Sequence, residues 1–262
     1  MDVVAIVALG RSVEEEAPRL AADLGLTAYE TGVMLRAPAP IIVFRSEDHG
    51  RAADLLGRLR SRGHDAVLCD LETVVSSEDM FRPKAFRFEG ADFIGIGHGE
   101  ERRLALADVF ALVRATHSRR IEDTVVARER KLSFGRAALT GGLLTSKTTT
   151  SEARRVTQER ESVLYVFRSD GTPWLLASME LRYDGLAQDM KLSKMENFEV
   201  LLRTLRELAP SAEFDARLLP VRANTTVVAA SPKHLSTSSS AALDVLAHVV
   251  ATAIGRAARP YR

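Results

Sequence analysis

The stretch Val3-Val4-Ala5-Ile6-Val7-Ala8-Leu9 decides how the first part of this 262-residue chain folds. A run of apolar residues without polar alternation is typical of a β-strand that is buried on both faces. A strand of this kind needs neighbours on each side and covering layers above and below. We therefore expect it to be the central strand of a sheet.

Two helices in series are expected after this strand. Ser12-Val13-Glu14-Glu15 has the pattern of a helix start in which a side chain caps the first turn, and Gly25 is placed to end that helix. Thr27-Ala28-Tyr29-Glu30 repeats the start pattern. Pro38 should end the second helix, because proline cannot continue the backbone hydrogen bonding.

A strand, a third helix and another strand complete the first module. Ile41-Ile42-Val43-Phe44 is strand-like, Ser46-Glu47-Asp48 places caps at a helix start, and Ala66-Val67-Leu68-Cys69 is a further apolar strand. The predicted order is β-α-α-β-α-β. It occupies residues 1–76, and we expect a small domain there.

This order resembles the domain shared by the ClpS protease adaptor and the C-terminal part of the ribosomal stalk protein. The local likeness lies in Met34-Leu35-Arg36-Ala37-Pro38 at the end of the second helix, and in Arg62-Gly63-His64 leading into Leu68-Cys69-Asp70-Leu71-Glu72. The resemblance implies a ClpS-like fold and, from the family's role, binding of a protein partner.

The ligand-binding residues of those families do not carry over. Adaptors of the ClpS type hold an N-terminal amino group with an Asn-Asp pair and a histidine, where this chain has Gly10-Arg11-Ser12 and Arg36-Ala37-Pro38. The stalk domain presents lysines on its first helices, where this chain has Glu14-Glu15-Glu16. The resemblance therefore implies a fold without a specific ligand.

Residues 84–218 are expected to form a second, mostly antiparallel β module. Strand-like segments precede one amphipathic helix near Asn197 to Leu208, which should end near Pro210. The expected strands are Phe86–Phe88, Phe93–Gly97, Leu104–Leu106, Phe110–Thr116, Thr124–Ala127, and a hairpin from Val163–Phe167 to Trp174–Leu181. This pattern resembles a bacterial pleckstrin-homology (PH-like) domain, which implies a curved sheet closed at one end by the helix.

Residues 219–262 should add one strand at Thr225–Ala230, a polar linker at Ser236–Ser240 and a helix at Ala241–Arg256. Asp244, His248 and Thr252 interrupt that helix, and it is short for a membrane span. We expect it to pack back on the body or to mediate self-association. The fold class expected for the whole chain is thus α+β.

Composition indicates a folded bacterial protein of the cytoplasm. Apolar residues make up 46% of the chain, enough for buried cores, and thirty of the 36 basic residues are arginine, which suggests a GC-rich genome. Cys69 is the single cysteine, which excludes an internal disulfide. Asp2 stands where an export signal would carry basic residues, so no secretion is expected.

Charge is distributed unevenly along the chain. Residues 1–79 carry eight basic and fourteen acidic side chains, whereas residues 114–160 carry eleven basic and five acidic ones. The basic region could bind an anionic lipid or nucleic acid, or it could be an ordinary solvated face, since acidic residues are interleaved. The candidate binding residues are Arg119, Arg120, Arg128, Arg130, Lys131, Arg136, Lys147, Arg154 and Arg155.

Catalytic and cofactor motifs find little support. Gly141 to Thr148 gathers glycines, hydroxyls and a lysine, but Ser146 stands where a phosphate-binding loop needs glycine. The histidines show no metal-ligand spacing, and we expect no metal and no cofactor. Cys69 at a strand end favours packing over nucleophilic chemistry.

Three functional hypotheses follow. The leading one is a non-enzymatic adaptor or scaffold in which two modules bring protein partners together. The alternative is a peripheral binder of anionic lipid or nucleic acid through residues 114–160. The third is an enzyme whose active site is assembled from distant loops.

Overall fold

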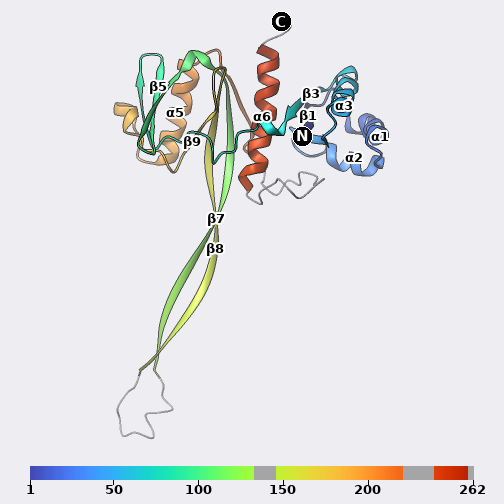
Figure 1. Cartoon of the computed structure of the whole chain (residues 1–262). Helices are drawn as coiled ribbons and strands as arrows, with labels where there is room; N and C mark the ends of the chain where they lie inside the picture. The colour runs from blue at the N-terminus through green and yellow to red at the C-terminus, as the bar shows by residue number, and fades with distance from the viewer. Residues whose placement is uncertain (133–145, 221–238, 259–262) are drawn as a thin grey trace. The chain divides into compact units, whose positions relative to one another are not determined.

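The structure is a computed structural model that describes residues 1–132, 146–220 and 239–258, with side chains for 1–117, 160–220 and 240–257. The chain forms two compact units (Figure 1). Unit 1 comprises Met1–His117 and Glu161–Arg262, and unit 2 comprises Ser118–Arg160. The expected α+β class, with antiparallel sheets and a C-terminal helix, is confirmed.

The first elements of unit 1 follow the order β-α-α-β-α-β. They are β1 (Asp2–Ala8), α1 (Val13–Leu24), α2 (Ala28–Leu35), β2 (Ile41–Ser46), α3 (His49–Ser61) and β3 (Asp65–Asp70), followed by the short 3-10 helix η1 (Leu71–Thr73). The sheet order is β2-β1-β3, and both pairings are antiparallel. The prediction that the opening apolar run is the central strand is confirmed.

Side-chain caps place the three helices where the sequence predicts them. Ser12, Thr27 and Asp48 each accept a hydrogen bond from a backbone N–H in the first turn of α1, α2 and α3. Around Thr27 the reciprocal bond from the N-cap N–H to Glu30 is also made, which completes a capping box. Gly25 ends α1 in the left-handed region at φ 69°.

Each face of β1 is covered by a different layer. Val4 and Ile6 belong to a core with residues of α1, α2 and α3. Val3, Ala5 and Val7 point to the opposite face, where they form a core with Val245, Val249 and Ala253 of the C-terminal helix α6 (Ser239–Ala258). The continuous apolar run is therefore explained by α6, which is more than 200 residues away in the sequence.

The other described residues add two sheets and one further α-helix. The elements are β4 (Ala85–Glu89), β5 (Asp92–Gly97), β6 (Glu100–Ala105), η2 (Leu106–Asp108), β7 (Val109–Leu132), β8 (Ser146–Arg168), β9 (Trp174–Ala177), η3 (Asp184–Asp189), α5 (Lys194–Leu208) and β10 (Glu213–Leu218). One sheet has the order β4-β5-β6 and the other β10-β7-β8-β9. An aromatic core that includes Phe93, Trp174 and Phe198 lies between them and α5.

Three details of the second part differ from the sequence-based expectation. Phe110–Thr116 and Thr124–Ala127 are parts of one 24-residue strand, β7, rather than two strands. Strand β9 ends at Ala177, before the expected Leu181, because the backbone turns there. Strand β10 is not among the expected strands. It pairs with β7 in parallel at the edge of the sheet opposite to β9, which is possible because the connection that contains α5 crosses the sheet between β9 and β10.

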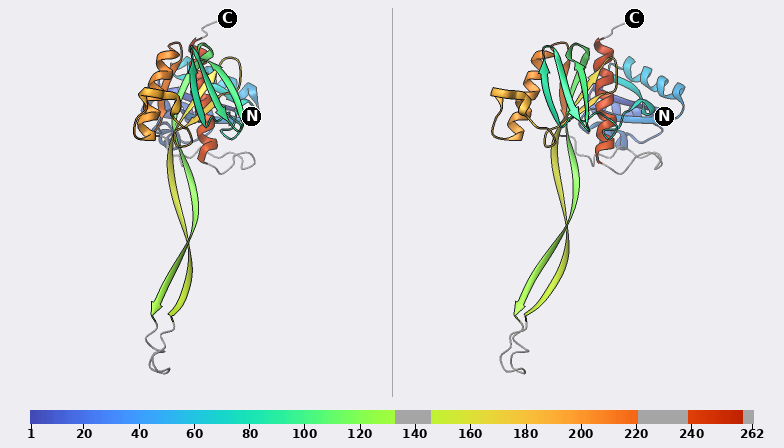
Figure 2. Two further views of the ribbon diagram at one scale, coloured as in Figure 1. Left: turned by 90° about the vertical axis from the view of Figure 1, so that its left-hand side faces the viewer. Right: turned by 60° about the vertical axis from the view of Figure 1, so that its left-hand side comes forward.

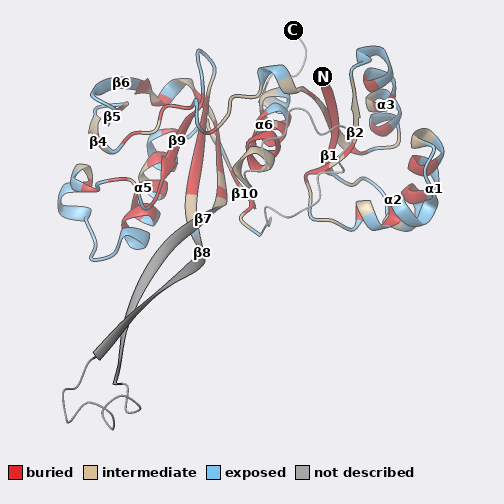
Figure 3. Ribbon diagram, turned by 60° about the horizontal axis from the view of Figure 1, so that its bottom comes forward, coloured by how far each residue is buried: buried red, intermediate tan, exposed pale blue. Residues whose placement is uncertain are grey.

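Helix α6 lies inside unit 1 (Figure 3). One side of it packs on β1 and β3, and Leu243, Ala247 and Val250 pack against Tyr165 and other residues of the β7–β8 sheet. By length and composition α6 could cross a membrane, but 61% of its apolar stretch Ser240–Ala257 is buried within the protein. A helix that is apolar on all sides is typical of such a core position. The expected strand at 225–230 lies outside the described residues.

Candidate functional site: the basic β-ribbon

Unit 2 is built from the two longest strands among the described residues. It contains the part of β7 from Ser118 onward and the part of β8 up to Arg160, and these strands are neighbours in one sheet. We call these two strand segments the β-ribbon. Strands in globular proteins usually have about five or six residues, whereas β7 has 24 and β8 has 23.

The division into units coincides with a division of charge. Unit 2 carries ten Arg and Lys residues against five Asp and Glu residues, a net charge of +5. The remaining 26 of 36 basic and 30 of 35 acidic residues give unit 1 a net charge of −4. The excess positive charge of this protein is therefore confined to one of its two compact units.

Eight of the nine predicted binding residues lie on the two strands of the β-ribbon. Those on β7 are Arg119, Arg120, Arg128, Arg130 and Lys131, and those on β8 are Lys147, Arg154 and Arg155. Strand pairing brings the two groups into one two-stranded element. Arg136 lies outside the described residues, and so do the side chains of the other eight.

A buried polar network lies in unit 1, next in sequence to both ends of the ribbon. The Tyr165 hydroxyl donates to Asp244 Oδ1 at 2.7 Å, and the His117 Nε2 atom lies 2.7 Å from the same hydroxyl. Because the hydroxyl proton is used on Asp244, His117 must donate from Nε2. The second Asp244 oxygen accepts the Ser77 N–H at 2.9 Å.

His248, one turn after Asp244 on α6, has both ring nitrogens occupied. The Val75 N–H donates to His248 Nε2 at 3.2 Å, so the ring proton is on Nδ1, which lies 2.8 Å from the Asp244 carbonyl oxygen. The polar residues that interrupt the apolar pattern of α6 thus bind the backbone of the segment after β3. That segment, which contains Val75 and Ser77, is held against α6.

Burial changes the ionisation of this network. It lowers the pKa of His117 and that of His248, which favours neutral rings. It also raises the pKa of Tyr165 well above its usual value, with Asp244 adding to the effect. The Tyr165 side chain is fully buried, so it cannot meet a substrate in this structure. The arrangement joins α6, β7 and β8 rather than presenting a reactive group.

A second buried group of charges lies between β1, α1 and β3. The Glu16 carboxylate is fully buried, 2.8 Å from Arg62 Nη2, with which it forms an ion pair, and 2.9 Å from His64 Nε2; neither contact has the angles of a hydrogen bond. Arg62 also bonds Asp23 at 2.8 Å, and His64 Nδ1 accepts the Gly10 N–H at 3.1 Å. This cluster fixes the loop after β1.

Other candidate chemistry is not assembled in the part of the chain with described side chains. No group of three or more His, Cys, Asp or Glu residues is placed there to hold a metal ion. Cys69 is buried, and this burial raises its pKa to about 11. His49 lies 2.8 Å from Asp2 at the surface. In the Gly141 to Thr148 segment, 141–145 lies outside the described residues, and Ser146 begins β8.

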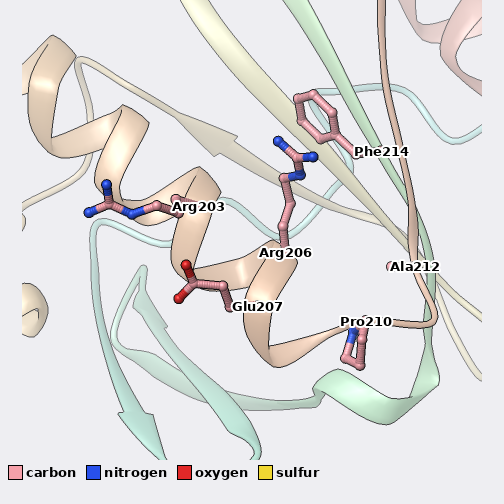
Figure 4. Close-up of a pocket in the computed structure, with 6 residues that line it drawn as sticks. All are labelled: Arg203, Arg206, Glu207, Pro210, Ala212 and Phe214. Atoms are coloured by element: carbon pink, nitrogen blue, oxygen red, sulfur yellow. The ribbon is translucent and has the colours of Figure 1, made fainter.

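The surface pockets of unit 1 are open. The largest described one, of about 550 Å³, lies at the end of α5 (Figure 4) and is lined by Arg203, Arg206, Glu207, Pro210, Ala212 and Phe214. The Arg206 guanidinium lies 4.6 Å from the centre of the Phe214 ring. Both arginines are exposed and share the pocket with a carboxylate, so this hollow lacks the buried, directed polar groups of a built ligand site.

Comparison with known proteins gave no relative: no protein-family model, no curated protein and no solved structure matches this chain. Its function must therefore be inferred from the residues and their arrangement alone.

Proposed function

We propose that this chain is a non-enzymatic binding protein whose β-ribbon binds nucleic acid. The observation that carries the proposal is the charge division: the ribbon unit has a net charge of +5, and unit 1 has −4. Long-range attraction of a polyanion is therefore directed to the ribbon, whereas unit 1 repels it.

The form of the ribbon favours nucleic acid over an anionic lipid surface. A two-stranded β-ribbon fits the major groove of duplex DNA, and ribbons are known binding elements for either groove. Arginine, which supplies six of the eight candidate residues on the strands, suits phosphate because its planar guanidinium can donate two hydrogen bonds. We expect backbone recognition with little dependence on sequence, because phosphate contacts carry none.

A charge-matched pair of variants tests this function in the full-length protein. The ribbon variant replaces Arg119, Arg120, Arg154 and Arg155 with glutamine. The control variant replaces four exposed arginines of unit 1, Arg19, Arg103, Arg182 and Arg203, with glutamine. Binding of a fluorescent duplex should weaken at least about tenfold in the ribbon variant, because four cationic contacts to phosphate are removed, and should not weaken in the control.

Two outcomes would reject the proposal. One is equal binding by both variants, because net charge would then matter more than its position. The other is binding of anionic vesicles, but not of the duplex, through the same arginines, because the partner would then be a lipid surface.

A second function, binding of a protein partner by the 1–76 module, is favoured by an exposed apolar stripe. Leu26, Tyr29 and Val33 are exposed on the surface formed around α2, and Tyr29 and Val33 are one helical turn apart. The proposed ClpS-like resemblance points to the same role. The test requires the whole chain, because α6 covers the sheet of this module: a Tyr29→Asp variant should lose the partner and keep its fold.

A further inference from the structure

The segment between η3 and α5 presents an unusual concentration of exposed apolar side chains. Leu192 is fully exposed, and Met179, Met190 and Met195 are each more than half exposed. Three of the six methionines of the chain are therefore at the surface instead of in a core. Figure 2 shows this segment, in orange, on the outside of unit 1. We call residues 190–195 the Leu192 turn.

The backbone of the Leu192 turn is held in place from inside the protein. The buried Asn197 side chain accepts the Lys191 N–H at 2.6 Å and donates to the Lys191 carbonyl at 3.1 Å. Ser193 and Glu196 form a capping box at the start of α5, and the Lys194 ammonium donates to the Met179 carbonyl. Leu192 is thus presented on a fixed loop, so little ordering cost remains when it is buried by a partner.

The composition of the turn indicates a bilayer rather than a protein pocket. Protein interfaces are enriched in Trp, Tyr and Arg, which this turn lacks, and depleted in lysine, of which it has two; its two methionines do not discriminate, because methionine is common at protein interfaces as well. Only six of the 36 basic residues are lysine, yet Lys191 and Lys194 flank Leu192. Lysine beside apolar residues suits the membrane interface, where its long stem lies among lipids and its ammonium reaches water; Lys191 is placed for this role, whereas the Lys194 ammonium is held by the Met179 carbonyl.

Charges around the turn are nearly balanced. Glu196 is used in the capping box, Asp184 pairs with Arg182, and Glu180 pairs with Arg82 and Lys84. Asp189 offsets one of the two lysines. Electrostatic attraction to an anionic surface should therefore be small beside the gain from burying Leu192 and its methionine neighbours.

We propose that the Leu192 turn inserts into the interface of a phospholipid bilayer, with Leu192 as the anchor. This goes beyond nucleic-acid binding by the ribbon and does not depend on it. Binding should be weak and reversible, because one apolar turn buries less surface than a single fatty acyl chain. It should persist at about 1 M salt, where electrostatic attraction is screened beyond about 3 Å.

A fluorophore at position 192 tests the insertion in the full-length protein. Leu192→Cys is labelled with an environment-sensitive dye, while the buried Cys69 stays unlabelled. With phosphatidylcholine vesicles, with or without phosphatidylglycerol, the emission should shift to the blue and be quenched by spin-labelled lipids. The same dye at Val33→Cys, also exposed, should not respond. In vesicle co-sedimentation Leu192→Asp should weaken binding at least about tenfold, the effect of one leucine.

The outcomes separate this proposal from the ribbon. An unchanged dye spectrum at position 192, or equal vesicle binding by Leu192→Asp and wild type, would overturn the insertion. A second contrary result would be vesicle binding that is abolished by salt, lost in the ribbon variant and kept in Leu192→Asp. Vesicle binding would then belong to the ribbon, and the insertion proposal would be overturned. Insertion with no duplex binding would leave this proposal standing while the nucleic-acid function fails.

Discussion

Asp244 on α6 and Tyr165 on β8 are joined by a hydrogen bond of 2.7 Å, and both side chains are buried. The same carboxylate accepts the Ser77 N–H, so one charged group ties α6 to the β7–β8 sheet and to the segment that follows η1. Because α6 also covers the sheet of β1 and β3, this contact is central to how unit 1 is held together.

Loss of the carboxylate should destabilise the protein strongly. Asp244→Ala removes the acceptor of two buried donors, the Tyr165 hydroxyl and the Ser77 N–H, and should lower the free energy of unfolding by about 3 kcal/mol. Tyr165→Phe removes one of the two hydrogen-bond donors to Asp244 and should lower the free energy of unfolding by about 2 kcal/mol. Urea denaturation measures both. Asp184→Ala, at an exposed ion pair, is the control, and an equal effect of Asp184→Ala and Asp244→Ala would refute the role of the network.

Stability should fall on mild acidification. Burial lowers the pKa of His117 and of His248 in the folded protein, so the unfolded chain binds protons first as the pH falls below about 6.5. The contribution of the two neutral histidines to the free energy of unfolding is fully present above that pH. It is lost as the pH falls toward the pKa values of His117 and His248 in the folded protein, by at most about 1.4 kcal/mol per pH unit for each histidine. Unfolding at about pH 7.5 and about pH 5.5 should show this loss, and His248→Gln should reduce it. If the difference in the free energy of unfolding between wild type and His248→Gln does not change with pH, His248 does not contribute to the loss of stability.

Two glycines should respond in opposite ways to alanine. A Cβ atom at Gly10 would lie 1.9 Å from the Gly63 carbonyl oxygen, so Gly10→Ala must displace backbone and should cost about 1–3 kcal/mol. Gly57, inside α3, has open space around it, and Gly57→Ala should stabilise by up to about 1 kcal/mol. Thermal unfolding of both variants checks the prediction. It is wrong if Gly10→Ala is neutral.

Cys69 should be nearly inert in the folded protein. Its pKa of about 11 leaves little thiolate at neutral pH, and the side chain is buried against α6. Reaction with a thiol reagent at about pH 7.5 should be at least about 100-fold slower than in urea, where the pKa returns to about 8.5. Comparable rates in both conditions would mean that α6 does not cover this face of the sheet.

The first module can be predicted well from the sequence because its signals are local. Ser12, Thr27 and Asp48 act within the turn that they cap, and the apolar run of β1 indicates its own burial. Burial of β1 on both faces implies a second covering layer. The identity of that layer cannot be predicted, because nothing near β1 in the sequence points to α6.

The second part is harder to predict because it depends on distant pairing. The charged residues between Thr116 and Thr124 interrupt the apolar alternation, so the pattern indicates two strands where the structure has one. Strand β10 is short and polar, and only its pairing with β7 makes it a strand. The polar residues Asp244 and His248 within an apolar helix are the one sequence signal of the buried network.

The candidate binding residues follow from charge counting alone, and the structure adds the element that carries them. The Leu192 turn has no such signal, because leucine and methionine next to an amphipathic helix are typical of core positions. Only the structure distinguishes these residues from core residues, through the exposed fractions of their side chains and the hydrogen bonds between Asn197 and Lys191.

The salt dependence of duplex binding tests the central claim most directly. If the ribbon binds phosphates, the logarithm of the binding constant should fall linearly with the logarithm of salt concentration. Replacing Arg119, Arg120, Arg154 and Arg155 should make this slope shallower by about 0.9 for each phosphate of duplex DNA that is no longer neutralised. The control with four neutralised arginines in unit 1 should keep the wild-type slope. Equal slopes in wild type and ribbon variant would contradict the proposed function.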